Sequence, residues 1–275
     1  MWTSVIPTGR GLGMQRSATN VGSAPPEAID TRAIDVWLFD LDGVLTDTAR
    51  VHAAAWKTTF DEVLARRAKD RGGEFRPFDP VEDYERYVDG KPRYDGVRDF
   101  LASRGITLPE GRLSDPPDRE TVDGVGNRKN ALVLESLAGL VTVFPGSVAL
   151  VKQLRAAGRR TAVVSASENC AAVLAAAHIT DLFDVMVDGR VARDQHLQGK
   201  PAPDTFLHAA SQLGSEPSRA AVVEDAPAGV MAGHAGGFAL VVGVARRATT
   251  AALTEAGADV VVGDLSELLD TVSGP

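Results

Sequence analysis

VWLFDLDGVLTD, residues 36–47, joins an apolar run to two closely spaced acids. Residues 36–39 are all apolar and predict a buried strand, which ends at Asp40, Asp42 and Gly43. Residues i and i+2 of an extended chain point to the same side, so both carboxyl groups should meet at the carboxyl end of this strand. Ligands of open parallel α/β sheets bind beyond such ends. The pair can therefore hold a divalent metal ion and leave one acid free for chemistry.

From residue 142 onward, short β-branched runs alternate with helical segments. The expected strands cover residues 161–165, 185–187, 221–223, 239–244 and 260–262. The expected helices cover residues 148–157, 170–177, 205–213 and 248–255. This alternation predicts an α/β fold with a doubly wound, mostly parallel, Rossmann-like sheet. The strand at residues 36–39 must join this sheet, because a lone strand is not stable.

The segment between the first strand and residue 142 carries no strand pattern. Apolar residues at helical spacing predict helices there over residues 46–68, 94–104 and 129–140, with a loop over residues 66–80. We therefore expect a discontinuous α/β core domain, with a helical cap domain inserted after its first strand. The expected boundaries are residues 33–45 and 142–275 for the core and residues 46–141 for the cap.

The first 32 residues are rich in Gly, Ser, Thr and Pro and contain no continuous apolar segment. This composition predicts a disordered N-terminal tail over residues 1–32 rather than a signal peptide. Met14 is an alternative to Met1 as the start of translation.

The net charge of −8 argues against binding nucleic acid through its phosphates, which requires a basic surface. It leaves a phosphorylated substrate open, because a few local cations suffice for that. Cys170 is the only cysteine, which excludes an intrachain disulfide and fits a reducing compartment, so we expect a cytoplasmic protein. No apolar run approaches the ~20 residues that a membrane span requires. The oligomeric state cannot be read from the sequence, and a monomer is compatible with it.

Side chains suited to catalysis stand at four separate places in the α/β segments. These are Asp40 and Asp42 after the first strand, Ser165 at the end of the next, Lys200 in a loop, and the pair Glu224 and Asp225. Strands that run in one direction end at one rim of a parallel sheet. We therefore expect the four places to converge on one point despite their separation in the sequence.

Such a set suits phosphoryl transfer, which needs a nucleophile in line and neutralisation of the phosphoryl oxygens. Asp40 would be the nucleophile that forms an aspartyl phosphate, and Asp42 the general acid and then the general base. One Mg²⁺ ion would lie between Asp40, the Asp42 main chain and Asp225, with Glu224 acting through water. Lys200 and the metal would keep Asp40 ionised, and Ser165 would donate a hydrogen bond to a phosphoryl oxygen.

This arrangement resembles the haloacid dehalogenase superfamily. DLDGV at residues 40–44 matches its first motif, Ser165 its second, Lys200 its third and Glu224–Asp225 its fourth. The resemblance spans about residues 35–264. It implies phosphatase or phosphomutase chemistry, because Asp42 is an acid at a position where the dehalogenases, phosphonatases and P-type pumps carry other residues.

The cap segment is similar to that of the β-phosphoglucomutase group within this superfamily. TDTARVHAAAW (residues 46–56) and DGKPRYDG (residues 89–96) match the stretch after the nucleophile and the substrate-binding loop of the group. The resemblance implies that His52 orients Asp42 and that Arg93 binds the distal phosphate. The positions that match substrate contacts are Thr48, His52, Trp56, Gly90, Lys91, Arg93, Lys129, Ser167 and Asn169.

One position departs from the group. Glu168 stands between Ser167 and Asn169, where the well-known members carry a lysine. A carboxylate repels a phosphate. Either another cation, Lys91 or Lys129, takes the place of this lysine, or the distal phosphate sits differently.

The resemblance implies a Mg²⁺-dependent conversion of β-glucose 1-phosphate into glucose 6-phosphate. An aspartyl phosphate on Asp40 would phosphorylate the sugar, the bisphosphate would reorient, and the other phosphate would return to Asp40. Glucose 1,6-bisphosphate would serve as activator. One alternative is a sugar-phosphate phosphatase with the same nucleophile. A remote alternative is a catalytically silent binding module, against which the intact acid pair argues.

Overall fold

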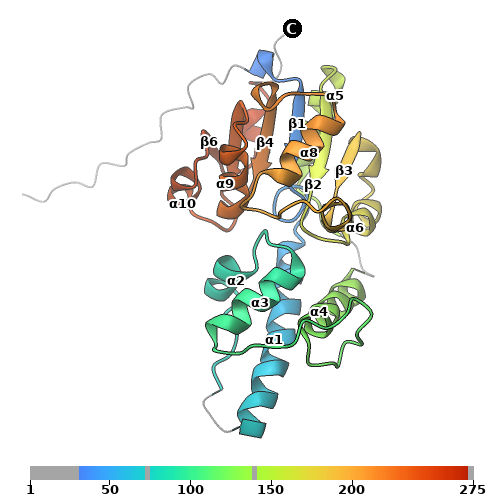
Figure 1. Ribbon diagram of the computed structural model, residues 1–275. Helices are drawn as coiled ribbons and strands as arrows, with labels where there is room; N and C mark the ends of the chain where they lie inside the picture. The colour runs from blue at the N-terminus through green and yellow to red at the C-terminus, as the bar shows by residue number, and fades with distance from the viewer. Residues whose placement is uncertain (1–30, 72–74, 138–140, 272–275) are drawn as a thin grey trace, which may run out of the picture.

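The computed structural model describes residues 31–71, 75–137 and 141–271 (Figure 1). Within these ranges six parallel strands form one sheet in the order β3-β2-β1-β4-β5-β6. The strands are β1 (Val36–Phe39), β2 (Arg160–Val164), β3 (Val185–Val187), β4 (Ala220–Glu224), β5 (Leu240–Val244) and β6 (Val260–Val262). The predicted doubly wound α/β fold is thus confirmed.

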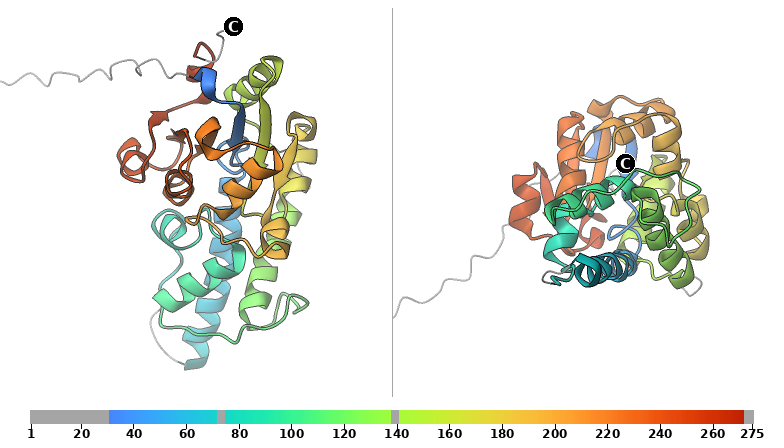
Figure 2. Two further views of the ribbon diagram at one scale, coloured as in Figure 1. Left: turned by 45° about the horizontal axis from the view of Figure 1, so that its top comes forward. Right: turned by 60° about the horizontal axis from the view of Figure 1, so that its bottom comes forward.

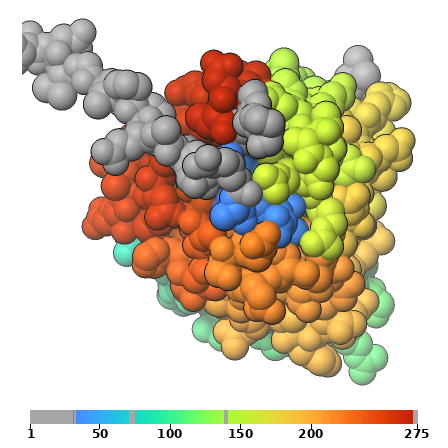
Figure 3. Space-filling model, turned by 90° about the horizontal axis from the view of Figure 1, so that it is seen from above, coloured from blue at the N-terminus to red at the C-terminus, as the bar shows by residue number. Residues whose placement is uncertain are grey.

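Strand β1 lies in the middle of the sheet. Phe39 at its end pairs in register with Val163 of β2 on one side and with Val223 of β4 on the other. In the view from above, the blue residues near the start of β1 lie next to both yellow-green and orange residues (Figure 3). This register brings the residues after β1, β2 and β4 to the same rim.

Helices cover both faces of the sheet, and alternate residues of β1 supply both cores. Trp37 and Phe39 pack toward one face, and Val36 and Leu38 toward the other, as the pleat of a strand requires. The first face is covered by α5 (Pro145–Ala156), α6 (Cys170–Ala176) and the 3₁₀ helix η4 (Leu265–Leu268). The second face is covered by α8 (Asp204–Gln212), α9 (Pro227–Ala235) and α10 (Thr250–Glu255).

A layer of helices lies beyond the carboxyl ends of the strands (Figures 1 and 2). It consists of α1 (Ala49–Arg71), α2 (Glu82–Tyr87), α3 (Arg93–Ser103) and α4 (Val122–Ser136), and we call it the cap. The cap has its own aromatic core, in which Phe60 stacks on Trp56 with ring centroids 4.9 Å apart and also contacts Phe78 and Phe100. The cap therefore has a hydrophobic core of its own, separate from the two cores of the sheet.

The two chain segments that link the cap to the sheet run side by side. The amide of Asp47 donates to the carbonyl of Thr142 at 2.9 Å, and that of Phe144 donates to Leu45 at 3.0 Å. The boundaries expected between the core and cap domains, after residues 45 and 141, lie next to these contacts and stay predictions. They also hold the residues just after Asp42 close to the base of the cap.

Some helices differ from the sequence-based expectation. Helix α1 continues to Arg71, so the loop expected from residue 66 begins later. The expected helix at residues 129–140 begins earlier, at Val122, where the side chain of Thr121 caps it by accepting the amide of Gly124. A Cβ on Gly126 would lie 2.6 Å from Cε1 of Tyr94, so glycine here allows α4 to pack closely on α3. Three helices were not predicted, namely α2, α7 (Gly189–Asp194) and α9.

Parts of four predictions lie outside the described residues. They are most of the N-terminal tail (residues 1–30), residues 72–74 of the expected loop, the end of the expected helix at residues 138–140, and residues 272–275 of the expected core domain. Thr31 and Arg32, also assigned to the tail, belong instead to the 3₁₀ helix η1 (Thr31–Ala33), where the Thr31 hydroxyl donates to the Thr271 carbonyl at 3.0 Å. In the part of the chain that the structure describes, no helix has the length and apolar character to cross a membrane.

Candidate active site

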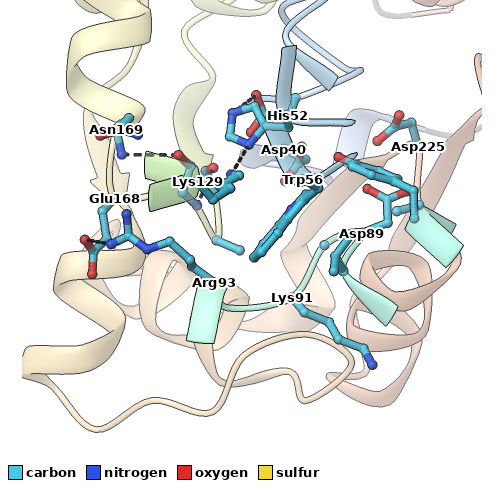
Figure 4. A pocket seen from close by; sticks show the side chains of 18 of the residues that line it. Asp40, His52, Trp56, Asp89, Lys91, Arg93, Lys129, Glu168, Asn169 and Asp225 are labelled. Atoms are coloured by element: carbon cyan, nitrogen blue, oxygen red, sulfur yellow. Dashed lines mark hydrogen bonds and ion pairs between the residues drawn. The ribbon is translucent and has the colours of Figure 1, made fainter. Parts of the chain in front are cut away.

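The carboxyl ends of β1, β2 and β4 meet the cap at one pocket (Figure 4). Asp40 follows β1, Ser165 follows β2, and Glu224 and Asp225 lie at the end of β4. All four residues are buried and line the pocket. The structure thus brings together side chains that stand far apart in the sequence.

Lys200 lies behind this group and connects two of its members. Its Nζ donates to Oδ1 of Asp40 and to Oε1 of Glu224, both at 2.5 Å. Burial alone would lower the pKa of Lys200, but the two carboxylates outweigh it and raise the pKa above its usual value. Lys200 therefore stays charged and holds Asp40 in a fixed position.

The remaining negative charge at the rim exceeds what one lysine can neutralise. Burial raises the pKa of Asp40, and the charges of Glu224 and Asp42 raise it further. The charge of Lys200 lowers this pKa but does not outweigh them. Burial raises the pKa of Asp225 as well, with nearby Asp89 and Glu224 adding to the effect. A cation is required here if these carboxylates are to be ionised together.

The residues present fit a hard divalent cation. Ligand oxygens of Asp40, Glu224 and Asp225 lie within 4.8 Å of one another, and oxygen ligands are those that Mg²⁺ prefers. Oε2 of Glu224 already accepts the amides of Asp225 and Ala226, at 3.0 and 3.1 Å, so Asp40 and Asp225 are the freer ligands. Gly43 completes the site, because a Cβ there would lie 1.9 Å from Oδ2 of Asp225. The cluster can therefore hold a metal ion.

Asp42 lies where the sheet and the cap meet, and residues at the start of the cap segment contact it. The Thr48 hydroxyl donates to Oδ1 of Asp42 and lies 2.7 Å from the hydroxyl of Thr46. Nε2 of His52 lies 3.5 Å from the same carboxylate oxygen. Asp42 is less buried than Asp40, so it can exchange protons with a ligand in the pocket.

Lys129 of α4 contacts His52 of α1 at the inner wall of the pocket. Nζ of Lys129 lies 2.7 Å from Nδ1 of His52 and 5.1 Å from the centre of the Trp56 ring. Burial, with the charge of Arg93, lowers the pKa of Lys129 to about 7. Burial, with the charge of Lys129, lowers the pKa of His52 to about 4. His52 is therefore neutral at neutral pH. That His52 orients Asp42 and that Lys129 contacts the substrate stay predictions.

The far end of the pocket differs from what the sequence suggested. Arg93 does not face open space, because its Nη2 donates to Oε2 of Glu168. Lys91, one of two cations considered as a replacement for the missing lysine, points away from the pocket and donates to Asp99 at 2.6 Å (Figure 4). The other, Lys129, is engaged by His52. Of Lys91, Arg93 and Lys129, Arg93 is thus the one that contacts the carboxylate at position 168.

Thirteen of the fifteen predicted site residues line the pocket; Thr48 lies behind Asp42 and Lys200 behind Asp40. Asn169, one of those that line it, donates through Nδ2 to Oδ1 of Asn130 at 2.8 Å.

Asp89, Asn130 and Arg193 are among the residues of the site that were not predicted from the sequence. Asp89 lines the pocket, and burial raises its pKa to about 7 against the charge of Arg247. It was overlooked although it begins the quoted loop DGKPRYDG. Asn130 follows Lys129 directly, and its contact with Asn169 depends on how α4 packs. Arg193 of α7 donates to the second oxygen of Glu168, and no motif marks it.

The comparisons with known proteins agree with this geometry. A family model described as haloacid dehalogenase-like hydrolase matches residues 34–237. A Mycobacterium tuberculosis protein named β-phosphoglucomutase is 53% identical over 236 residues, which are 84% of this chain and 90% of that protein. A Bacillus subtilis protein of the same name is 31% identical over 232 residues, 84% of this chain and 90% of that one. A crystal structure of β-phosphoglucomutase from Clostridium difficile superposes with a TM-score of 0.70 at 25% identity, over 86% of this chain and 93% of that one. The resemblance inferred from the motifs is confirmed.

Proposed function

We propose, since the chain belongs to the haloacid dehalogenase-like hydrolase family, that it is a Mg²⁺-dependent β-phosphoglucomutase acting through an aspartyl phosphate. It would convert β-glucose 1-phosphate into glucose 6-phosphate. The observation that carries the proposal is the pair of acids after β1. Asp40 is buried against Lys200, and Asp42 accepts a hydrogen bond from Thr48 and lies 3.5 Å from Nε2 of His52. The 53% identity to a protein named β-phosphoglucomutase supports the choice of substrate.

The residues of the chain can perform both half-reactions. In the first, a carboxylate oxygen of Asp40 attacks the phosphorus, the bond to the sugar oxygen breaks, and Asp42 gives that oxygen a proton. In the second, Asp42 takes a proton from a sugar hydroxyl, whose oxygen attacks the aspartyl phosphate and frees Asp40. Ser165 donates to a phosphoryl oxygen, and Lys200 stabilises the charge on the transferring group.

A metal ion fits the proposal through the carboxylates already described. Asp40 and Asp225, with the Asp42 main chain, would hold one Mg²⁺ ion, and Glu224 would act through water; the bound ion would neutralise charge on the phosphoryl oxygens. Glucose 1,6-bisphosphate is part of the proposal as the activator that loads Asp40 with phosphate.

The sugar would occupy the pocket between the sheet rim and the cap. Gly90 and Trp56 line it from the cap, and Ser167 and Asn169 line it from the loop after β2. The distal phosphate would reach Arg93. The cap would exclude water from the aspartyl phosphate, which favours transfer to a sugar over hydrolysis. A cytoplasmic location stays a prediction.

A sugar-phosphate phosphatase is the second candidate, and one observation favours it. The carboxylate of Glu168 contacts Arg93 at the end of the pocket where a mutase must hold a second phosphate. A phosphatase needs no such second phosphate, because water accepts the phosphoryl group. A silent binding module is less consistent with the site, since Asp40, Lys200 and the acid cluster would then have no task.

The experiment that separates these functions follows both products. The purified protein, with Mg²⁺, receives β-glucose 1-phosphate and a trace of glucose 1,6-bisphosphate, and glucose 6-phosphate and inorganic phosphate are measured together. A mutase forms glucose 6-phosphate with little inorganic phosphate, whereas a phosphatase releases phosphate in proportion to substrate consumed. Asp40→Asn should abolish both, while Asp181→Asn, at an exposed aspartate, should change neither. Turnover that survives Asp40→Asn would contradict covalent catalysis by Asp40.

A further inference from the structure

Glu168 is held between two arginines at the end of the pocket that lies away from Asp40. Nη2 of Arg93, at the start of cap helix α3, donates to Oε2 of Glu168. Nη1 of Arg193, on α7 beside the sheet, donates to Oε1. We call Arg93, Glu168 and Arg193 the distal triad. It joins the cap to the core through one carboxylate that has two cationic partners.

The two arginines differ in how much they are exposed. The Arg93 side chain is 10% exposed and Glu168 is 20% exposed, whereas Arg193 is 41% exposed. Burial strengthens an ion pair only where both partners are shielded from water, so the Arg93–Glu168 contact is the stronger of the two. Glu168 thus neutralises Arg93, which lines the pocket, and also forms a weaker ion pair with Arg193.

Arg93 keeps an unused donor. Its Nε is buried and, within the described part of the chain, has no hydrogen-bond partner. A guanidinium presents its donors in a fork that matches two oxygens of a phosphate. The two lysines that line the pocket already have hydrogen-bond partners, which are Asp99 for Lys91 and His52 for Lys129. An anion entering this end of the pocket would therefore bind Arg93, where it meets Glu168.

There is room for Glu168 to move. A second pocket lies on the other side of the distal triad and is lined by Arg93, Glu168 and Arg193, together with Pro92, Ala192 and Leu197. The triad thus stands between this space and the catalytic pocket. A rotation of the Glu168 side chain toward Arg193 would carry its charge into the second space and leave Arg93 facing the catalytic pocket.

We infer that Glu168 is a built-in competitor for the distal phosphate of the substrate. Without ligand it occupies Arg93 and holds the cap on the core. When a sugar phosphate brings its distal phosphate to Arg93, Glu168 gives up this contact and keeps the one to Arg193. Two adjacent anions cannot share one guanidinium without repulsion, so binding includes the cost of displacing Glu168. The inference rests on the proposed function, because it takes a phosphorylated sugar as the ligand.

The test measures binding without turnover. Glucose 1,6-bisphosphate, which would place a phosphate at each end of the pocket, and phenyl phosphate, which lacks the second phosphate, are titrated by calorimetry into the Asp40→Asn protein with Mg²⁺. Adding Glu168→Gln should tighten the bisphosphate about tenfold, the equivalent of one charged hydrogen bond, and leave phenyl phosphate unchanged. Glu62→Gln is the matched control, since Glu62 pairs with Arg128 on the exposed cap surface and lines neither pocket.

A substitution of Arg193 should change the affinity for the bisphosphate in the opposite direction. Arg193→Gln leaves Glu168 with Arg93 as its sole partner in the triad and should weaken the bisphosphate severalfold. In the Glu168→Gln background the same substitution should have little effect, because Arg193 acts through Glu168. A purely electrostatic role of Arg193 toward the ligand would instead weaken binding equally in both backgrounds.

The outcomes separate this inference from the proposed function. Bisphosphate binding that is unchanged or weakened by Glu168→Gln overturns the competitor role, and weakened binding would assign Glu168 to a sugar hydroxyl. Absence of bisphosphate binding in every variant overturns the proposed function and this inference together. A further readout uses no ligand. Hydrogen exchange of the first turn of α3 should accelerate in Glu168→Gln, because the tie from cap to core is lost, and unchanged exchange would contradict that tie.

Discussion

Lys129 on α4 and His52 on α1 form a hydrogen bond of 2.7 Å between Nζ and Nδ1 inside the cap. The pKa of Lys129 is about 7, and its protonated form has only donors, so in that form Nδ1 of His52 is the acceptor and the ring proton is on Nε2. Nε2 lies 3.5 Å from Oδ1 of Asp42, too long for a good hydrogen bond, and has no hydrogen-bond partner among the described residues. A small shift of the cap toward the sheet would bring this N–H onto the general acid.

Removing Lys129 should therefore slow catalysis, because Nδ1 of His52 loses its donor and the ring proton is no longer confined to Nε2. Lys129→Met keeps the bulk of the side chain but loses the donor, and kcat for p-nitrophenyl phosphate should fall about tenfold, as for one charged hydrogen bond. KM should stay the same, because this ester has no second phosphate for Lys129 to bind. Lys57→Met, at the surface lysine that pairs with Asp61, is the control. A change in KM alone would assign Lys129 to substrate binding instead.

The buried His52 should make stability depend on pH in the acid range. Its pKa is about 4 in the folded protein, below its usual 6.5, because of burial and the charge of Lys129. The unfolded chain therefore takes up the proton first as the pH falls, so the contribution is complete above pH 6.5 and is lost down to about pH 4. The loss amounts to about 3 kcal/mol at 1.36 kcal/mol per pH unit.

Urea unfolding of wild type and His52→Gln between pH 7.5 and pH 4 measures this contribution as a difference. The wild type should lose more of its free energy of unfolding than the variant, while carboxylates that titrate in both proteins cancel. Curves that stay parallel throughout the range would contradict a neutral buried His52.

Asp42→Asn should separate the formation of the aspartyl phosphate from its breakdown. Acetyl phosphate has a leaving group that needs no proton, so Asp40 should still be phosphorylated. Breakdown needs a base to activate the acceptor, so the phosphoenzyme should accumulate, and turnover of β-glucose 1-phosphate should fall roughly 10²–10⁴-fold. Mass spectrometry of the intact protein measures the phosphorylated fraction over time. Decay as fast as in the wild type would remove Asp42 from the role of base.

Gly43 and Gly105 offer a matched pair of substitutions. Both have positive φ, +96° and +65°, so alanine strains the backbone at either position by about 1–2 kcal/mol. A Cβ at position 43 would also lie 1.9 Å from Oδ2 of Asp225, whereas at position 105 there is nothing within 4 Å. Calorimetry should show loss of Mg²⁺ binding in Gly43→Ala and unchanged binding in Gly105→Ala. Equal binding in both would exclude Asp225 as a ligand near this turn.

The strands and their ends could be predicted because their signals are local. The run at residues 36–39 is apolar throughout, and Asp40 and Asp42 mark where it stops. The parallel sheet then brings Ser165 and Asp225 to the same rim, since both also follow apolar runs. Helix α2 gave no such signal, because six residues are too few for a helical period.

The distal triad could not be predicted, because it depends on how separate elements pack. Glu168 and Arg193 are 25 residues apart, and their contact requires α7 to lie beside the loop after β2. Lys91 forms its ion pair with Asp99 because the loop before α3 packs on that helix, and the spacing of residues in the sequence does not predict this contact. The departure at position 168 was visible in the sequence, but its arginine partners were not.

The central place of β1 in the sheet has a consequence for how the polypeptide folds as it is synthesised. Phe39 leaves the ribosome early, yet its partners Val163 and Val223 follow only 124 and 184 residues later. Cap helices such as α1, α3 and α4 contact one another and can associate while the strand is still unpaired. Because such distant pairings make folding slow, β1 is the apolar segment that a nascent chain leaves exposed the longest. Chaperone binding during translation would be most useful at this strand.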